Sequence, residues 1–501
     1  MARGSTSGSV PSMPSRTAVG DAPRAVARPG ILGVPVLASY AMAQFGLSAM
    51  NTLVTTQIPF FYVDTLKLPA VLFGWVMLIG KLWDGMTDPV MGHVTDNTRS
   101  RFGRRRPYFV LGAPLLALFT FLLFSPPRDL TGPALFPWLL ITFLGAFSAR
   151  TVFETPYQAM APDLTPDYDQ RTRVATWRVT IGNLGDMTGA IVPMALLAYW
   201  APRPTFRWSG AAVATIIAVT ALVTFLRVPE RLDRVPSRRV PLLRNLRRIL
   251  TFPVRNPPAR ILIASYACAV FATTLPVAVF RFVDKYVFTA TGVENSFLGP
   301  IVEQMGKNAF LDLGVILGYF AGVFLSAPLW ARALRTRDKK QGYLFAFLYL
   351  GGIASGIFFI PRDLGILFPV LNLFLGAGAL GLWMLPGAIG PDVLEWEELH
   401  HGSRHEGGFY GIWMLVQKTG GGIALFAMGA LLHAIGFVPD VAPGPETVQG
   451  LRLLYGATPL VVSGIAVLVF SRYPLTREAY AQVRASLEAR DAAARDEQEA
   501  P

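Results

Sequence analysis

Twelve apolar segments, each near or beyond the length that crosses a lipid bilayer as a helix, run through most of the sequence. A helix needs about 20 apolar residues to span the hydrocarbon core. Only 15% of the 501 residues are charged, whereas soluble proteins carry roughly 25%. The sequence therefore predicts an all-α polytopic membrane protein, with helices at 33–63, 69–96, 107–126, 133–162, 172–200, 208–227, 259–288, 307–332, 342–361, 364–392, 407–436 and 449–472.

The basic residues predict how the chain is oriented in the lipid bilayer. The formal net charge is +13, but the excess lies in short gaps between the apolar segments, so nucleic acid is not an expected partner. The gaps 97–107 and 227–260 contain five and ten Arg, whereas 437–448 contains none. Because basic loops stay in the cytoplasm, we expect a bacterial inner-membrane protein with both termini cytoplasmic.

The longest basic gap falls near the middle of the chain and divides the segments into two sets of six. Pro-Asp dipeptides end the fourth segment at Asp163 and the tenth at Asp392, and a cation follows each, at Arg178 and Lys418. Weak six-plus-six symmetry is typical of a major facilitator fold, whose site lies near the midplane between the halves. We expect a disordered cytoplasmic tail at 1–30 and a first six-helix bundle at 31–227. A cytoplasmic basic linker at 228–258 leads to a second six-helix bundle at 259–472, and a cytoplasmic helix with its tail follows at 473–501.

Two of these cytoplasmic parts have a predicted local structure. The linker is either a short amphipathic helix on the anionic inner leaflet or a plain solvated connection. In the C-terminal part, Thr476 is expected to cap a polar helix that runs to about 494, since a Thr side chain accepts a hydrogen bond from the first turn.

The sequence carries no enzyme motif that we identify. There is no nucleophile elbow, zinc-protease signature or Walker sequence. The single cysteine, Cys268, excludes a disulfide within the chain and a zinc site built on cysteines. Acids and histidines at 395–406 could bind a metal, although a charged gate is the stronger expectation. We therefore expect neither an enzyme nor a cofactor.

Asp84 and Asp88 put two carboxylates on one face of the second segment, because residues four apart share a helix face. Ionisable groups at membrane depth are costly and mark functional sites. Carboxylate and hydroxyl oxygens are hard ligands, so we expect both acids, with Thr87 and Thr151, to bind a coupling cation, Na⁺ or H⁺. The alternative is a structural pair bonded to neighbouring backbone. We expect Lys418 to face the acids, since an unpaired ammonium would be costly there.

Further charges lie in the fourth and fifth segments. Arg150 and Glu154 are four residues apart and can pair. Glu154 could instead accept hydrogen bonds from substrate hydroxyls, with Arg178 as its partner or as a donor to the substrate. A purely structural ion pair between Glu154 and Arg178 is the alternative. Asp186, on nearly the same face as Arg178, is a further candidate.

Charged residues on the predicted cytoplasmic side have complementary signs. The basic turn after the second segment and the basic residues before the fifth would oppose the acidic loop between the tenth and eleventh. We expect a salt-bridged cytoplasmic gate that includes Arg104, Arg105, Arg171, Arg173, Glu395, Arg404 and Glu406.

The chain resembles the glycoside–pentoside–hexuronide:cation symporter family of the major facilitator superfamily, typified by the melibiose carrier. The resemblance runs from about 33 to 490. It rests on Trp83-Asp84-x-x-x-Asp88-Pro89-x-x-Gly92, on Arg101-Phe-Gly-Arg-Arg-Arg-Pro107, on Pro156-Tyr157-x-Ala-x-x-Pro162 followed by Arg171-x-Arg173 and Arg178, and on Asp392-x-x-Glu395 through Arg404-x-Glu406-Gly407 to Lys418.

The resemblance implies that Asp84 and Asp88 coordinate the coupling cation with Lys418 nearby, and it places Thr151 at a cation-site hydroxyl position. It also puts the substrate near the following residues, with Arg150 as a neighbour: Glu154, Arg178, Ser48 and Gln158. Ser48 replaces an acid that clamps sugar in the melibiose carrier, Gln158 replaces an aromatic residue, and Thr87 replaces a side-chain amide. These departures leave a galactoside substrate and the choice between Na⁺ and H⁺ open.

The function that the resemblance implies is cation-coupled symport of a sugar or glycoside by alternating access, by a monomer in the lipid bilayer. Animal lysophospholipid symporters share the paired-acid motif, so a carrier of a lysolipid or other amphiphile is an alternative. A receptor or scaffold on the same fold, without transport, is another.

Overall fold

The computed structural model describes residues 32–98, 100, 103–165, 167–197, 200, 202–228, 251–252, 255–288, 307–402 and 405–499. Helices account for nearly all of this part of the chain, and it contains no strand. The expected tail at 1–30, most of the linker at 228–258 and Arg404 of the expected gate lie outside the described residues.

The first six predicted segments are present as helices whose ends lie within four residues of the expected bounds, except that the sixth begins at Pro202, six residues before the expected 208. They are α1 (Val34–Pro59), continued by the π-helical turn η1 (Phe60–Thr65), α2 (Ala70–Asn97), α3 (Arg106–Leu123), α4 (Leu135–Leu164) after the 3₁₀ turn η2 (Gly132–Ala134), α5 (Tyr168–Leu197) and α6 (Pro202–Arg227).

The second six segments are also helical. They are α8 (Pro257–Val287), α10 (Lys307–Thr336), α11 (Lys339–Ser355) with the 3₁₀ turn η3 (Gly356–Phe359), α12 (Leu367–His401), α13 (Glu406–Ala434), and a continuous run of α14 (Pro445–Arg452), the π-helical turn η4 (Leu453–Ala457) and α15 (Thr458–Ser471).

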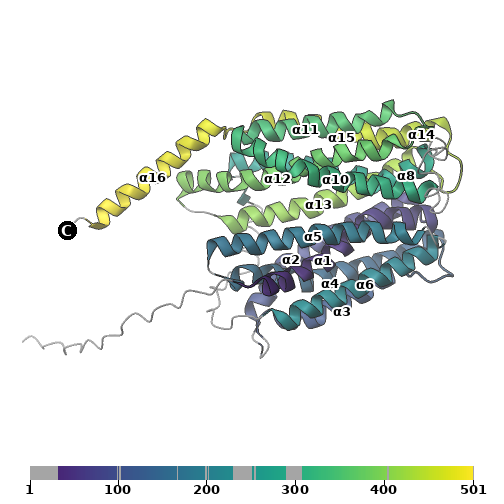
Figure 1. Ribbon diagram of the computed structural model, residues 1–501, viewed down its shortest axis with the longest axis horizontal. Helices are drawn as coiled ribbons and strands as arrows, with labels where there is room; N and C mark the ends of the chain where they lie inside the picture. Colours follow the sequence, from purple (N-terminus) through teal and green to yellow (C-terminus); the bar gives the residue numbers. More distant parts are fainter. Residues whose placement is uncertain are drawn as a thin grey trace, which may run out of the picture.

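A last helix, α16 (Arg477–Glu499), follows the membrane helices. Thr476 Oγ1 accepts a hydrogen bond from the Ala479 amide at 3.3 Å, so the predicted cap is present. α16 projects from one end of the bundle, the terminal end, and α14 lies at the other, the opposite end (Figure 1).

Ten helical segments in the described residues are long and apolar enough to cross a membrane, and the chain is a multi-pass membrane protein. α1 and α5, with 26 and 30 residues, have the length but are more polar. α1 carries Gln44, Ser48 and Asn51, and α5 carries Arg178 and Asp186. These two helices therefore add polar groups to the charged side chains that α2, α4 and α13 bring to the candidate site.

The packing of the second half repeats the packing of the first. α1 packs on α5 and α6, α3 on α4 and α6, and α2 on α4; in the same way, α8 packs on α13 and α15, α11 on α12 and α15, and α10 on α12. Between the halves, α2 packs on α13, α5 on α10 and α1 on α8. The expected major facilitator fold of two related six-helix bundles is confirmed.

Glycines on α13 bring it close to α2. A Cβ at Gly429 would collide with the Ala70 carbonyl oxygen, and a Cβ at Gly422 would lie 2.7 Å from Lys81 Cβ. Small residues allow helix backbones to approach closely in membranes, and the two helices meet closely at Gly422 and Gly429. This approach brings Lys418 within reach of the acids on α2.

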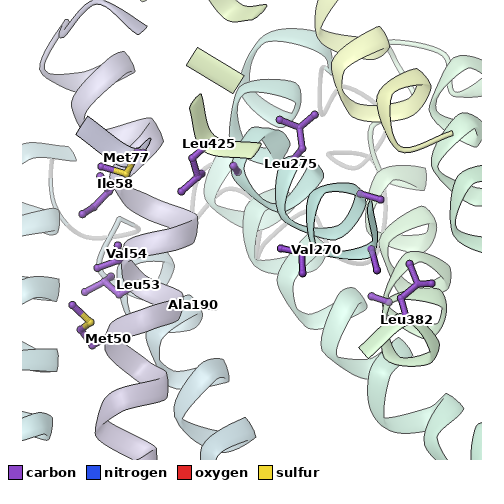
Figure 2. Packing of buried hydrophobic residues seen from close by; sticks show 14 of the residues in the cluster. Met50, Leu53, Val54, Ile58, Met77, Ala190, Val270, Leu275, Leu382 and Leu425 are labelled. Atoms are coloured by element: carbon purple, nitrogen blue, oxygen red, sulfur yellow. The ribbon is translucent and has the colours of Figure 1, made fainter. Parts of the chain in front are cut away.

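Apolar side chains fill the space inside each half and between them. Figure 2 shows Met50, Leu53, Val54 and Ile58 along one stretch of α1. All four are at most 3% exposed. The polar site is therefore set in a close-packed apolar surrounding, in which charges interact strongly.

Candidate cation and substrate site

Lys418 lies between Asp84 and Asp88, as the sequence predicts. Its Nζ is 2.9 Å from Asp84 Oδ1 and 2.5 Å from Asp88 Oδ2. The Asp84 side chain is 1% exposed and that of Asp88 is 27% exposed. One ammonium thus neutralises one of two carboxylates, and the contact joins α2 of the first half to α13 of the second.

Both predicted hydroxyls lie in the same cluster. Thr151 Oγ1 is 3.2 Å from Asp84 Oδ1 and 3.1 Å from Asp88 Oδ1. Thr87 Oγ1 lies 3.3 Å from Thr151 Oγ1 and donates to the Asp84 carbonyl oxygen at 3.2 Å. A hydroxyl has one proton and two lone pairs, so Thr151 can donate to only one acid at a time and can offer a lone pair to a cation.

One oxygen of the cluster has no protein partner. Asp84 Oδ2 is buried and accepts no hydrogen bond from any described residue. Buried carboxylate oxygens are normally satisfied. The donor set of carboxylates and hydroxyls fits a small hard cation or a proton, and Asp84 Oδ2 is available to it.

Lys81, one turn before Asp84, does not extend to the membrane surface. Its Nζ lies over the Phe147 ring, 4.4 Å from the ring centroid. A cation over an aromatic face is stabilised by the ring quadrupole. Lys81 is thus held beside the site by a ring of α4, and the acids pair with Lys418 of α13.

Glu154 is paired within its own helix. Arg150 Nε donates to Glu154 Oε2 at 2.7 Å, and Gln158 Nε2 donates to Oε1 at 2.9 Å. The side chains of Arg150 and Glu154 are 14% and 15% exposed. The i,i+4 pair expected from the sequence is confirmed. Among the described residues Glu154 pairs with Arg150 and forms no ion pair with Arg178, which was the alternative.

Asn51 joins this group from α1. Arg150 Nη1 donates to Asn51 Oδ1 at 3.0 Å. The role of Asn51 was not foreseen from the sequence, although a side-chain amide inside an apolar segment is itself a signal. Arg150 therefore links α4 to α1 as well as holding Glu154.

The other predicted substrate residues lie where α1 meets α5. Ser48 Oγ accepts from Gln44 Nε2 at 3.4 Å, and a Cβ at Gly182 would lie 3.3 Å from Ser48 Oγ. Arg178, one turn before Gly182, lies near the Tyr40 hydroxyl. Asp186 Oδ1 accepts from Thr52 at 2.7 Å. The structure places the predicted substrate residues on α1, α4 and α5.

The described residues of the expected gate lie at the terminal end. Arg105 donates to the Ala159 carbonyl oxygen, and Arg171 Nε donates to the Thr165 carbonyl oxygen at 3.1 Å. Glu395 Oε2 accepts from the Tyr480 hydroxyl of α16 at 2.7 Å. Arg104 is half-buried, and Arg173 and Glu406 are exposed. These contacts tie α16 to α12, and the gate itself stays a prediction.

A cluster of charges at the opposite end was not foreseen from the sequence. Lys285 Nζ lies 2.7 Å from Asp64 Oδ2 and 2.9 Å from Asp440 Oδ1. Lys67 Nζ lies 2.5 Å from Asp440 Oδ2. The Tyr286 hydroxyl donates to Asp64 Oδ1 and accepts from the Asp440 amide. Asp64 and Lys67 belong to the first half and the other three to the second, so this opposite-end cluster joins the halves.

Similar proteins are transporters. An isoprimeverose transporter of Lactiplantibacillus pentosus is 25% identical over 449 residues, which cover 88% of each chain. A sodium-dependent lysophosphatidylcholine symporter of Danio rerio is 23% identical, over 83% of this chain and 82% of that one. Among solved structures, a mutant of the nucleoside transporter NupG matches with a TM-score of 0.63 at 13% identity, over 87% of this chain and all of that one.

A family model supplies the assignment. The model described as MFS/sugar transport protein matches residues 39–477, a range that contains every membrane helix except the first residues of α1. The relatives and the structural neighbour are membrane transporters, and none is an enzyme. The chain belongs to the MFS/sugar transport protein family of major facilitator transporters.

Proposed function

We propose that this secondary transporter couples a monovalent cation, Na⁺ or H⁺, to symport of a sugar or glycoside, working by alternating access as a monomer. The observation that carries the proposal is the position of Lys418 Nζ, within 2.9 Å of both Asp84 and Asp88. An ammonium between two carboxylates occupies the place that a coupling cation would take.

The cation would act by replacing Lys418. Two carboxylates and one ammonium carry a net charge of −1, and a cation on Asp84 Oδ2 and the Thr151 hydroxyl would supply the same positive charge as the ammonium that it replaces. Two cations cannot share this space without strong repulsion. Cation binding therefore favours a state in which Lys418 has left the acids, and the contact between α2 and α13 changes.

The link from cation to substrate runs along α4. Thr151 contacts the acids, while Arg150 and Glu154 on the same helix are among the residues predicted to bind the substrate. A shift of α4 on cation binding would move both. Coupling is reciprocal, so the substrate must raise the affinity for the cation by the same factor as the reverse.

Polar groups near Glu154 suit a substrate with several hydroxyls. The carboxylate of Glu154, the guanidinium of Arg150 and the amides of Gln158 and Asn51 supply acceptors and donors on α4 and α1. Arg178 of α5 adds a guanidinium beside Tyr40. The family description and the isoprimeverose transporter support a sugar. Ser48 in place of an acid makes the site less negative than that of the melibiose carrier.

A carrier of a lysolipid is the second candidate. The face of α2 next to the acids exposes Leu82, Trp83, Met86 and Val90, each at 41% or more. An exposed apolar face beside a charged site suits a ligand with a polar head and an apolar chain. The lysophosphatidylcholine symporter of Danio rerio supports this candidate.

The orientation is also a proposal. Basic loops stay in the cytoplasm, and Arg104, Arg105 and Arg106 lie at the terminal end. We place both termini in the cytoplasm of a bacterial inner membrane. The opposite-end cluster would then join the two halves on the outer side.

A ligand screen tests the proposed function. Purified protein is heated with sugars, glycosides and lysolipids, with Na⁺ or choline at equal ionic strength and at two pH values. Bound ligands raise the melting temperature according to their occupancy. We expect a sugar or glycoside whose shift is larger with Na⁺ or at the lower pH. A lysolipid with that behaviour would support the second candidate, and shifts without any cation dependence would contradict coupling.

A further inference from the structure

A second pair of buried acids lies in the second half, on α8 and α10, near the opposite end. Asp284 is 1% exposed and Asp312 is 4% exposed. Arg281, one turn before Asp284 on α8, is 4% exposed. Two acids and one base thus share a dry environment, and the proposed transport function uses none of them.

The guanidinium of Arg281 already donates three hydrogen bonds. Its Nε and Nη2 both donate to Asp312 Oδ2, at 3.2 Å and 2.9 Å. Its Nη1 donates to Gln57 Oε1 of α1 at 2.8 Å, and its Cζ lies 4.0 Å from the centroid of the Phe60 ring in η1. Arg281 therefore pairs with Asp312 on one side and anchors α8 to the first half on the other.

Asp284 has no such partner. Neither of its carboxylate oxygens has a hydrogen-bond partner in the described chain, and Asp312 Oδ1 has none either. The charged groups that act on Asp284 are Asp312 of α10 and Arg281 of its own helix. The described parts of α1, α12, α13, α14 and α15, which pack against α8, bring it no further charge.

Ionisation of Asp284 is strongly unfavourable at this buried position. Burial of a charge without a counter-charge or hydrogen bonds is very costly. With both acids ionised, the group of Arg281, Asp284 and Asp312 would carry a net charge of −1. One proton makes it neutral, and a carboxyl O–H on Asp284 can donate to the unpartnered Oδ1 of Asp312.

We infer that Asp284 and Asp312 share one proton and form a proton-binding site, separate from Asp84 and Asp88, that keeps the opposite end of the transporter closed. Loss of the proton leaves an excess carboxylate in a dry core. Water must then enter between α8 and α1, which breaks the bond from Arg281 to Gln57. Because the closed state binds this proton more tightly, the contribution of the pair to closure is present at low pH and is lost as the pH rises.

Infrared spectroscopy of the full chain tests the proton itself. A buried protonated carboxyl group gives a carbonyl band that shifts in D₂O. We expect this band at neutral pH in the unaltered protein and its loss in Asp284→Asn. We also expect its loss in Asp312→Asn, because Asp284 then ionises and pairs with Arg281. The exposed acid Glu446 at the same end provides the control Glu446→Gln, which should keep the band.

A distance measurement tests the closure. In a Cys268→Ala background, spin labels are attached at Asp129→Cys and Asp363→Cys, on exposed loops of the two halves at the opposite end. The distance should lengthen as the pH rises above neutral in the parent and in Glu446→Gln, and should stay short over the same rise in Asp284→Asn and Asp312→Asn. If one variant fails to fold, the other gives the same test.

Three results would overturn the inference. The first is a parent protein without a protonated-carboxyl band. The second is a pH-dependent distance that is unchanged in the variants. The third is a band that disappears on addition of Na⁺ at constant pH, since the two acids would then hold a metal cation.

Discussion

Lys67 of the first half and Asp440 of the second form an ion pair of 2.5 Å, and both have a positive backbone φ, 64° and 58°. No other non-glycine residue in the described ranges has a positive φ. Such backbone conformations cost roughly 1–3 kcal/mol each and persist where the surrounding structure holds them. The strained residue of each half, Lys67 in the first and Asp440 in the second, is thus the one that forms the ion pair between the halves.

Removal of this ion pair should loosen the opposite end. Asp440→Asn abolishes the charge that Lys67 and Lys285 both contact. Exposed ion pairs contribute about 0.2–1 kcal/mol each, so we expect a few-fold increase in the population open at this end. Spin labels at Asp129→Cys and Asp363→Cys would measure it. Glu446→Gln should leave the distance unchanged, and an equal effect of both variants would contradict a specific role of Asp440.

Acid should weaken the same contact. Hydrogen bonds from Lys67 and then Lys285 hold the pKa of Asp440 below its usual value. A depressed pKa means that the carboxylate contributes to closure above the ordinary Asp pKa of about 3.9, and that the contribution is lost as the pH falls below it. The label distance should therefore lengthen in acid, and Asp440→Asn should abolish that change. An acid response that survives in Asp440→Asn would assign the effect to another group.

The approach of α13 to α2 offers a prediction with a control in the adjacent residue. Gly422→Ala places a methyl group 2.7 Å from Lys81 Cβ, whereas nothing lies within 4 Å of a Cβ at Gly421. Overpacking costs typically about 1–3 kcal/mol. We expect Gly422→Ala to lower the melting temperature and to change cation affinity, because it displaces Lys418 from the acids. Gly421→Ala should do neither; equal behaviour of the two would contradict this packing.

The pair of Arg150 and Glu154 should show strong coupling in stability. Removal of one partner of a buried pair leaves an uncompensated charge and costs about 3–5 kcal/mol. Both side chains here are largely buried, with 14% and 15% exposed. Arg150→Met and Glu154→Met should each lower the melting temperature strongly, and the double variant should recover most of the loss. Additive losses would show that Arg150 and Glu154 act independently.

The sequence predicted most of the fold because membrane helices have a long apolar signature. It also predicted the contact of Lys418 with Asp84 and Asp88, since an isolated ammonium at membrane depth requires a counter-charge. It did not reveal the partner of Asp440, because loop residues carry no periodic pattern that shows which loops meet. Arg281 and Asp284 were visible inside a predicted helix, but charges near a helix end are ordinarily explained by extension to the membrane surface.

The helix boundaries were less predictable than the helices. α12 continues to His401, beyond the expected end at 392, because the acidic stretch after Asp392 is helical. Pro386 and Pro391 lie inside α12, although proline usually favours a helix end. Tyr480 of α16 contacts Glu395 in this extension, and such a tertiary contact is not readable from the sequence.

Direct measurement of cation binding to Asp88→Asn tests the proposed coupling most sharply. Titration calorimetry with Na⁺ at fixed ionic strength, together with measurement of proton uptake, covers both possible ions. Asp363→Asn, at an exposed loop, is the control. We expect the unaltered protein and Asp363→Asn to bind one of the two cations and Asp88→Asn to lose that binding. Unchanged binding in Asp88→Asn would contradict the assignment of the coupling site to Asp84 and Asp88.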